Sequence, residues 1–565
     1  MTSVILIWLY MFITTFTIGY GVLRVITWHI PYHVRHWDAC LLCGMVCVTV
    51  YAQFFSLFAG VGLAANVIMC VVCILIWWSD RAGFRQAVQE LLHGNSHYGA
   101  LRFSLFVILV LLFAYGTSRG MIHYDTGLYH AQSIRWIEEY GVVRGLGNLH
   151  CRLAYNSSSF ALSALYSMAF LGGRSFHCCA GFLACILAAV CLEIVNHMRA
   201  WELRVSDFAR AMGIYYLVNI FDEMISPASD YFMVLIAFYI IIRWLDLLEH
   251  GEKTVLPYAL LCVLGVFLMT VKLSAALILL LTLWPAYHLI RNSKWREILT
   301  YVGLGFVTVL PYFIRNVVIS GWLVYPFTQF DFFPVVWKIP KGIADYDARE
   351  IQVWGRGYTD VSRYDISVKE WLPGWFSSLA GSDKAFVLLA GVSVCVLLVY
   401  GAGMVIKWWR RQRDILLVQI TVAASFLFWL CTSPLIRYGC VYVYLVPAVV
   451  FGGIYNMIFG CGQRWLDKTV RRLAVVFSVL FLLYKGLALG REIVRDYTND
   501  YWLVQKDYEN YETYSYEIDG VTFYLPVEGD QVGYESFPSS PSVPEIGFLG
   551  EGIRDGFYSL DGGRT

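Results

Sequence analysis

Residues 102–130 read RFSLFVILVLLFAYGTSRGMIHYDTGLYH, an apolar run over 102–119 that ends abruptly in a polar loop. A helix of about 20 apolar residues crosses the hydrocarbon core of a bilayer, so this run predicts a transmembrane helix. The whole chain has the same character, with 58% hydrophobic residues, 15% charged residues and a mean hydropathy of +0.59. A soluble domain carries about 25% charged residues. The composition therefore predicts a protein whose solvent is lipid.

Apolar runs of spanning length recur along the chain and predict an all-α polytopic membrane protein with about fourteen transmembrane helices. We place these helices near 3–27, 38–60, 62–78, 102–119, 176–196, 208–226, 231–248, 255–271, 274–290, 298–315, 384–406, 414–431, 438–459 and 473–489. The opening segment, Met1 to Tyr20, has no basic n-region and no clear small-residue cleavage site. It therefore predicts a retained first span and not a signal peptide.

Lysine and arginine in the short loops predict the orientation, because cytoplasmic loops are enriched in these residues. Four basic clusters fall on one side when fourteen spans are threaded in this way: Arg199/Arg204, Arg291/Lys294/Arg296, Lys407/Arg410/Arg411/Arg413 and Arg464/Lys468/Arg471/Arg472. That side is then the cytoplasm, and both termini and both long inter-span regions lie outside. The threading requires Phe160 to Gly172 to be an amphipathic helix at the outer interface instead of a span.

The sequence divides into a multi-pass transmembrane domain, 1–489, and an acidic extracytoplasmic appendage, 490–565. Outer loops at 119–175 and 320–384 interrupt the transmembrane domain. From Arg491 onward the chain holds fifteen acidic and five basic residues, and it alternates in places, as in YSYEIDGVTFYLPV. Alternation and turn signals such as Asp519-Gly520 predict a small β-containing tail. Its acidity is also what a solvated surface would show.

Several function classes lack their usual sequence support. The net charge of +1 gives no global field for binding nucleic acid. The sequence holds no Walker A loop, Rossmann fingerprint or HExxH motif, which argues against ATP-driven transport and zinc proteolysis. Most of the fifteen cysteines lie inside predicted spans, where cysteine packs as a small hydrophobe.

The first outer loop holds the densest group of ionisable residues: His123, Asp125, His130, Arg135, Glu138 and Glu139. If residues 126–140 form a helix, His130 and Glu138 share a face at two-turn spacing, and we take both as catalytic candidates together with Asp125. Asp125 would also stand at the N-cap of that helix, a structural role that is compatible with catalysis. His123 and His130 have the chemistry of metal ligands, and a divalent cation such as Mg²⁺ or Mn²⁺ is compatible with the carboxylates.

A second group of polar residues lies at the predicted outer ends of spans: Asp222, Glu223, Asp230, Lys272, Arg315, Arg437 and Tyr438. Each alone has a structural explanation, such as capping for Asp222 or Asp230 and snorkelling for Lys272 or Arg315. Together with His123, these residues predict a substrate-binding site at the level of the outer interface. A transporter would more naturally place its ionisable residues near the bilayer midplane.

Carboxylates beside fixed cations suit the transfer of a sugar from a phosphate-linked donor. One carboxylate takes a proton from the acceptor hydroxyl as that hydroxyl attacks the anomeric carbon. Arginine and lysine stabilise the departing phosphate, whose charge grows as the bond breaks. A lipid-phosphate donor would arrive laterally from the membrane, which agrees with a site at the interface.

The order of these features resembles the GT-C superfamily of integral-membrane glycosyltransferases. The matching pieces are HYDTGLYH at 123–130, NSSSFALSALYSMAFLGG at 156–173, SPASD at 226–230, VKLS at 271–274, PYFIRNVVISGWLVYPF at 311–327 and SPLIRYG at 433–439. The resemblance implies a GT-C-like fold with Asp125 as the acceptor-side base. It also implies that Lys272, Arg315 and Arg437 contact the donor phosphate. In many of these enzymes the acidic loop follows the first span, whereas here about three additional spans precede it. An acidic tail is also not a general feature of that superfamily.

The resemblance implies a polyprenyl-phosphate-linked sugar donor, a glycan or lipid acceptor and membrane lipids as partners. The chain also resembles bacterial multi-pass proteins from surface-polysaccharide contexts, which implies the bacterial inner membrane. One alternative is a polysaccharide polymerase or ligase, which also uses polyprenyl-linked sugars. Another is a transporter or flippase of lipid-linked glycan, for which an inverted repeat and mid-span charges are expected and are not evident in the sequence.

Overall fold

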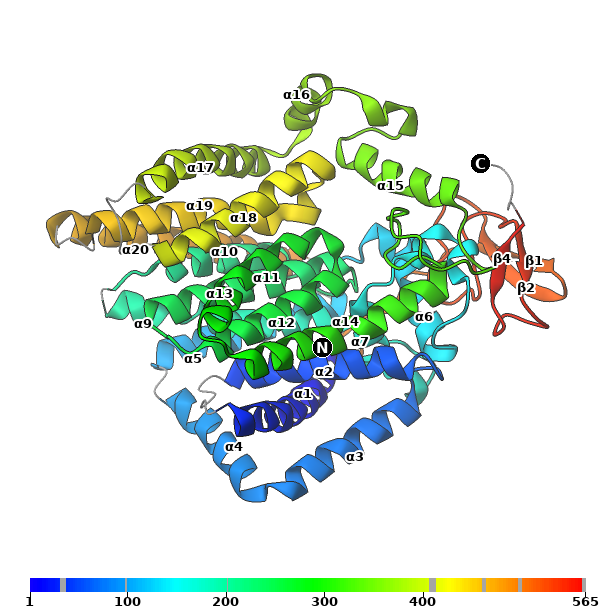
Figure 1. The fold of residues 1–565 in the computed structure, drawn as a ribbon, viewed down its shortest axis with the longest axis horizontal. Coiled ribbons are helices and arrows are strands. Elements are labelled where there is room, and N and C mark those ends of the chain that lie inside the picture. The colour runs from blue at the N-terminus through cyan, green and yellow to red at the C-terminus, as the bar shows by residue number, and fades with distance from the viewer. Residues whose placement is uncertain are drawn as a thin grey trace.

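The computed structural model describes residues 1–30, 37–96, 99–200, 202–405, 413–459, 464–495 and 500–560. Most of its helices lie side by side in one bundle, and the small strands of the C-terminal segment lie at one end of it (Figure 1). In these ranges ten helices are long and apolar enough to cross a membrane, or up to eleven if one bent pair counts as a span. The chain is therefore a multi-pass membrane protein.

The spans account for most of the helical elements. The ten that meet the length and hydropathy of a span are α1 (Thr2–His29), α2 (Trp37–Phe55), α5 (Ala100–Arg119), α8 with α9 (Cys179–Cys191 and Ile194–Arg199), α11 (Ser229–Glu249), a 3₁₀ segment with α13 (Leu273–Thr282 and Leu283–Arg291), α14 (Trp295–Ser320), α17 (Gly381–Val405), α18 (Arg413–Thr432) and α19 (Ile436–Phe459). Three other predicted spans form the shorter or more polar helices α10 (Val205–Asn219), α12 (Val255–Val271) and α20 (Arg464–Arg495). The predicted helical multi-pass class is confirmed, while this criterion gives ten or eleven spans where the sequence predicted fourteen.

The bent pair consists of α3 (Leu63–Ser79) and α4 (Arg81–Ser96), which meet at 99° and form a V at the lower edge of the bundle (Figure 1). Asp80 stabilises the bend, because its carboxylate accepts hydrogen bonds from the Tyr20 hydroxyl at 2.5 Å and the Gly83 N–H at 3.1 Å. The apolar α3 exposes many aliphatic side chains, as a lipid-facing helix does, whereas α4 is polar.

The first outer loop contains α6 (Ala131–Glu139) and α7 (Ser158–Tyr166), followed by a 3₁₀ turn at Ala169–Leu171. Every residue of α7 is buried, and the helix packs against α2 and α6. The predicted amphipathic character of this segment is therefore wrong, because α7 has no exposed face. Serine and alanine are frequent in α7, and such small residues allow neighbouring helices to approach on all sides.

The second outer loop contains α15 (Lys341–Gly355), a 3₁₀ turn at Val361–Asp365 and α16 (Val368–Ser378). Asp347 of α15 is buried and ties this loop to the first one. Its carboxylate accepts a hydrogen bond from the Tyr325 hydroxyl at 2.9 Å and pairs with Arg152 at 3.0 Å. It also accepts from the Tyr155 hydroxyl. The two outer loops therefore form one packed unit.

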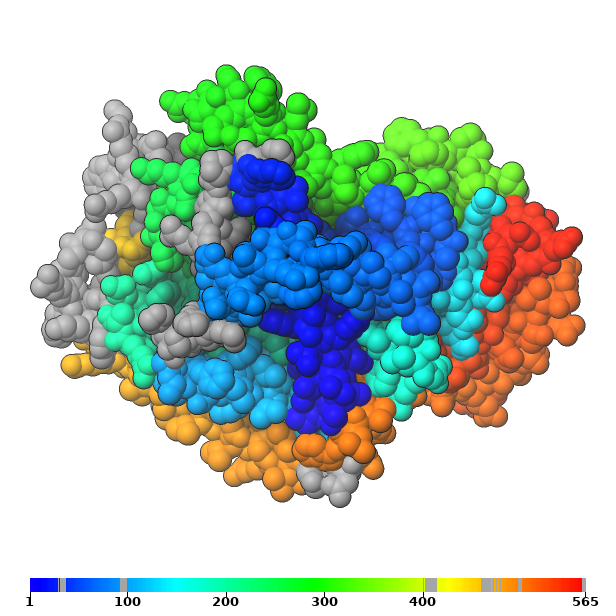
Figure 2. Space-filling model, turned by 90° about the horizontal axis from the view of Figure 1, so that it is seen from below, coloured from blue at the N-terminus to red at the C-terminus, as the bar shows by residue number. Residues whose placement is uncertain are grey.

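The C-terminal segment contains two small antiparallel sheets, which confirms the predicted β-containing tail. Strands β1 (Thr513–Ile518) and β2 (Val521–Pro526) form a hairpin whose turn, Asp519-Gly520, has positive φ at both residues. This is the geometry that a two-residue hairpin turn requires. Strand β3 (Ile546–Phe548) pairs with β4 (Phe557–Ser559). Figure 2 shows the orange and red tail lying against the cyan residues of the first outer loop.

Helix α11 lies at the centre of the bundle and is buried from Asp230 to Asp246. It packs against α8, α10, α12 and α19. A rise of 1.5 Å per residue separates its two terminal aspartates by about 24 Å. The helix therefore links polar groups at two opposite ends of the bundle.

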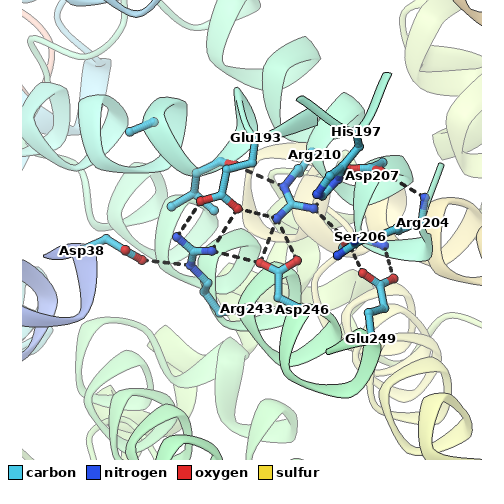
Figure 3. A network of polar contacts seen from close by, with 12 residues as sticks. Asp38, Glu193, His197, Arg204, Ser206, Asp207, Arg210, Arg243, Asp246 and Glu249 are labelled. Carbon is cyan, nitrogen blue, oxygen red and sulfur yellow. Dashed lines mark hydrogen bonds and ion pairs between the residues drawn. The ribbon is translucent and has the colours of Figure 1, made fainter. Parts of the chain in front are cut away.

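A network of buried charges surrounds the Asp246 end of α11 (Figure 3). Arg210 of α10 donates hydrogen bonds to Asp246 and to Glu193, both at 2.7 Å. Arg243 of α11 donates to Asp38 at 2.9 Å, to Asp246 at 3.0 Å and to Glu193 at 3.1 Å. Since each guanidinium has several carboxylate partners, we interpret the network as a structural lock that joins α2, α8, α10 and α11.

Candidate functional site

The loop after α5 begins where two backbones touch. A Cβ atom on Gly120 would lie 1.7 Å from the carbonyl oxygen of Asp222, so only glycine fits at this position. The next residue, Met121, donates its N–H to the same carbonyl at 2.9 Å. The start of the loop is thereby fixed to the turn between α10 and α11.

Asp125 stands immediately before a π-helical turn, Thr126–His130, that continues into α6. The predicted helix over 126–140 is present in this form. The Asp125 side chain makes no capping hydrogen bond to the turn. Instead, its carboxylate oxygen Oδ2 accepts a hydrogen bond from Nη2 of Arg437 at 2.6 Å. Asp125 therefore acts as an ion-pair partner here, and π-helical turns are frequent at functional sites.

Three helix ends bring the other charges to Asp125. Asp230 lies in the first turn of α11, Lys272 directly follows α12, and Arg437 lies in the first turn of α19. Nζ of Lys272 donates a hydrogen bond to Asp230, and Nε of Arg437 lies 4.0 Å from the same carboxylate. The ring of Tyr438 lies 3.8 Å from Nζ of Lys272. We call these five residues the Asp125 cluster.

The cluster balances two carboxylates against two cations, and each cation already has a carboxylate partner. Burial raises the pKa of the Asp125 carboxyl, but the opposing contributions, led by the charge of Arg437, outweigh burial, so the pKa lies below the ordinary value. The side chains of Arg437 and Asp125 are 28% and 20% exposed, so an incoming ligand can reach both. A bound anion would compete with Asp125 for Arg437.

The two predicted histidines differ in their surroundings. Nδ1 of His123 accepts the N–H of Asp125 at 3.1 Å and lies 3.0 Å from Nη1 of Arg437. Burial and then Arg437 lower the pKa of His123, so the ring is a neutral acceptor within the cluster. His130 is buried against Phe160, with ring centroids 5.3 Å apart, and burial lowers its pKa to about 3. His130 therefore supports the loop from behind.

Asp222 and Glu223 lie in the turn that frames the Asp125 cluster. Asp222 contributes its backbone carbonyl to the loop, and Glu223 accepts a hydrogen bond from the Tyr231 hydroxyl at 2.7 Å. Burial raises the pKa of both carboxyls. Within the described ranges neither carboxylate pairs with a cation of the cluster.

The structure places Glu138 and Arg315 away from the Asp125 cluster. The Glu138 carboxylate accepts hydrogen bonds from the Ser175 hydroxyl at 2.8 Å and the Tyr534 hydroxyl at 2.6 Å, and burial raises its pKa. Glu138 follows His130 by eight residues of continuous helix, yet its carboxylate bonds to groups outside the Asp125 cluster. Arg315 is buried in α14 and donates to Asn156 at 2.9 Å.

A divalent cation does not fit the residues that are present. The part of the chain that the structure describes holds no group of three or more His, Cys, Asp or Glu side chains placed to bind a metal ion. In the cluster, Asp125 and Asp230 pair with Arg437 and Lys272. No step below therefore uses a metal ion.

A family model described as Domain of unknown function (DUF8201) matches residues 1–444. The chain belongs to this family. No curated protein and no solved structure matches the chain. The DUF8201 match includes both outer loops and the start of α19, so it contains every residue of the Asp125 cluster. Residues 445–565, which include the tail, lie beyond the match.

The tail beyond the DUF8201 match holds the loop that carries Asp125. The carbonyl oxygen of Gly127 accepts the N–H groups of Val532 and Gly533, both at 2.9 Å. From α6, Nε2 of Gln132 donates to the carbonyls of Gly533 at 2.9 Å and Ser536 at 2.8 Å. We call these contacts the tail clamp. The clamp connects the acidic appendage directly to the candidate site.

Sequence reasoning missed two residues of this region, Gln132 and Tyr124. Gln132 is a neutral residue inside an amphipathic helix, and no local pattern links it to a segment near the C-terminus. Tyr124 precedes Asp125, and its hydroxyl donates a hydrogen bond to the carboxylate of Asp530 in the tail. The only local signal is the place of Tyr124 directly before Asp125 in the sequence.

Proposed function

We propose that this protein is an integral-membrane glycosyltransferase with a GT-C-like fold. It would move a sugar from a polyprenyl-phosphate-linked donor to a glycan or lipid acceptor on the outer face of the membrane. The observation that supports this proposal is the Asp125 cluster. It places the Asp125 carboxylate beside Arg437 at the start of α19, and Lys272 at the end of α12 beside Asp230 of α11. Sugar transfer from a phosphate needs such a base and such cations together.

Asp125 would accept the proton of the acceptor hydroxyl while the hydroxyl oxygen bonds to the anomeric carbon of the donor. The anomeric carbon–oxygen bond to phosphate breaks, and its electron pair leaves with the phosphate. Arg437 and Lys272 would stabilise the charge that grows on that phosphate. Arg437 holds Asp125 through a hydrogen bond, so a donor phosphate that engages Arg437 would release the base.

We also propose that α3, α10, α12 and α20 complete fourteen spans, with the Asp125 cluster on the extracytoplasmic side of a bacterial inner membrane. The backbone N–H of Thr2 donates to the carbonyl of Trp502 at 2.9 Å, so the N-terminus lies beside the tail. The tail clamp in turn holds the first outer loop. The N-terminus, the described part of the tail and the cluster would then lie on one face, which supports the proposed orientation.

The experiment that tests the proposal is mass spectrometry of lipid-linked and surface glycans from cells that carry wild-type protein or Asp125→Asn. Loss of one sugar, with its unmodified acceptor accumulating, is the expected result. Asp222→Asn is the matched control, because Asp222 lies in the turn that contacts the same loop and, among the described residues, its carboxylate pairs with no cation of the cluster. Normal glycan composition with shortened chains would favour a polymerase. Unchanged glycans in an Asp125→Asn strain that retains the protein in its membrane would remove Asp125 from the role of base.

A further inference from the structure

A small cavity lies behind the first outer loop, apart from the Asp125 cluster. Residues of α6, α7 and α14 line it, among them Ser133, Trp136, Asn156 and Arg315. It offers about 10 Å³ of space for the centre of a water-sized sphere. One water molecule or one monatomic ion needs about this much room.

Arg315 brings an uncompensated positive charge to the wall of this cavity. Its side chain is 2% exposed and donates hydrogen bonds to Asn156 at 2.9 Å and to the Ser56 hydroxyl, both of them neutral groups. In the described ranges no carboxylate lies within 4.0 Å of its guanidinium, whereas the buried Arg152 has two carboxylate partners. Burial of a cation without a counter-charge is strongly unfavourable.

Two further donors at the cavity have no acceptor. The indole N–H of Trp136, which is 0% exposed, and the buried hydroxyl of Ser133 make no hydrogen bond within the described chain. An indole N–H and a guanidinium can only donate. The surroundings of the cavity therefore offer positive charge and unused donors.

We propose that this cavity binds one small monovalent anion of the chloride class, with Arg315 as its counter-charge and Ser133 and Trp136 as further donors. A water molecule fits the space but does not offset the charge. A lipid phosphate exceeds the space. Arg315 is therefore an anion-binding residue that joins α14 to α6, the helix that follows the Asp125 loop. This inference goes beyond sugar transfer and does not depend on it.

Thermal unfolding of the purified full-length protein in sodium chloride and in sodium gluconate, at equal ionic strength, tests the proposal. At a chloride concentration of about 100 times the Kd, the folding equilibrium should favour the folded state about a hundredfold more, seen as a rise of a few °C in Tm. Arg315→Gln should abolish the difference between the two salts. Arg144→Gln, which removes an exposed arginine of the same loop, should preserve it. Equal Tm values of the wild-type protein in both salts would overturn the proposal.

If Arg315→Gln does not fold, anomalous diffraction from wild-type crystals grown in sodium bromide decides the question. A bromide peak among Arg315, Ser133 and Trp136 is the expected result. Full occupancy of the cavity by water, with no anomalous signal, would show that the charge is not offset by a halide.

Discussion

Replacement of Asp125 by asparagine is expected to strengthen the binding of a lipid phosphate, although it should abolish turnover. The Asp125 carboxylate accepts a hydrogen bond of 2.6 Å from Arg437, so an incoming phosphate that binds Arg437 must displace Asp125. Two unit charges about 4 Å apart interact by about 4 kcal/mol at an effective dielectric constant of about 20. The side chains of Arg437 and Asp125 are 28% and 20% exposed, and solvent screening reduces this value.

We therefore take about 1–2 kcal/mol as the gain when the competing carboxylate is removed, which corresponds to about 5- to 30-fold tighter binding. Isothermal titration of the purified protein with farnesyl phosphate, a short soluble isoprenoid phosphate, measures this affinity. Arg437→Ala should weaken binding, and Asp222→Asn should leave it unchanged. Unchanged or weaker affinity in Asp125→Asn, with intact folding, would refute the competition between Asp125 and phosphate for Arg437.

Three further predictions concern the frame of the site. Gln132→Ala removes two hydrogen bonds of about 1 kcal/mol each, so it should speed hydrogen exchange of the backbone amides of residues 124–130 at least about tenfold. Gln419→Ala, which removes a hydrogen bond in α18, should leave this exchange unchanged. Equal exchange in Gln132→Ala and wild-type protein would show that the tail clamp does not hold the loop. Burial lowers the pKa of His177 to about 3, so below pH about 6.5 the unfolded state takes up a proton that the folded state does not. The free energy of unfolding should therefore fall by about 1.4 kcal/mol per pH unit as the pH drops below about 6.5. His177→Phe should therefore flatten the fall of Tm between pH 7 and pH 5, and an unaltered slope would contradict this reasoning. Arg243→Met removes a hydrogen-bond donor from each of three carboxylates and should lower the free energy of unfolding by about 3–5 kcal/mol, as measured by thermal unfolding. A near-neutral effect would show that the network does not lock the helices together.

The class of the protein and most of the Asp125 cluster could be predicted from the sequence, because both depend on local features. The length of an apolar run predicts a span, and charges that end such runs must lie near an interface. Asp230, Lys272 and Arg437 each stand at the end of an apolar run, so threading put them at one level with Asp125. The structure brings these residues into direct contact.

Other features depend on contacts between distant segments and leave little trace in the sequence. The composition of α7 agrees with burial in protein as well as with contact with lipid, so its place inside the bundle could not be read from hydropathy. Glu138 was assigned to the site because it shares a helical face with His130, but helical periodicity does not show which segment packs against that face. Its actual partner, Tyr534, lies in the tail. Arg315 looked like a snorkelling cation until the structure showed it to be buried among neutral groups.

The two ends of α11 explain why the bundle carries so many buried charges. Asp230 at one end must stay within reach of Lys272 and Arg437, and these residues come from separate helices that loops alone would align poorly. At the other end, Arg243 and Asp246 fix the height and rotation of α11 against α8 and α10 (Figure 3). Because the backbone of a helix is rigid, fixing one end of α11 also fixes the height and rotation of its other end. A site that needs charges held to within a fraction of an ångström therefore benefits from a lock about 24 Å away.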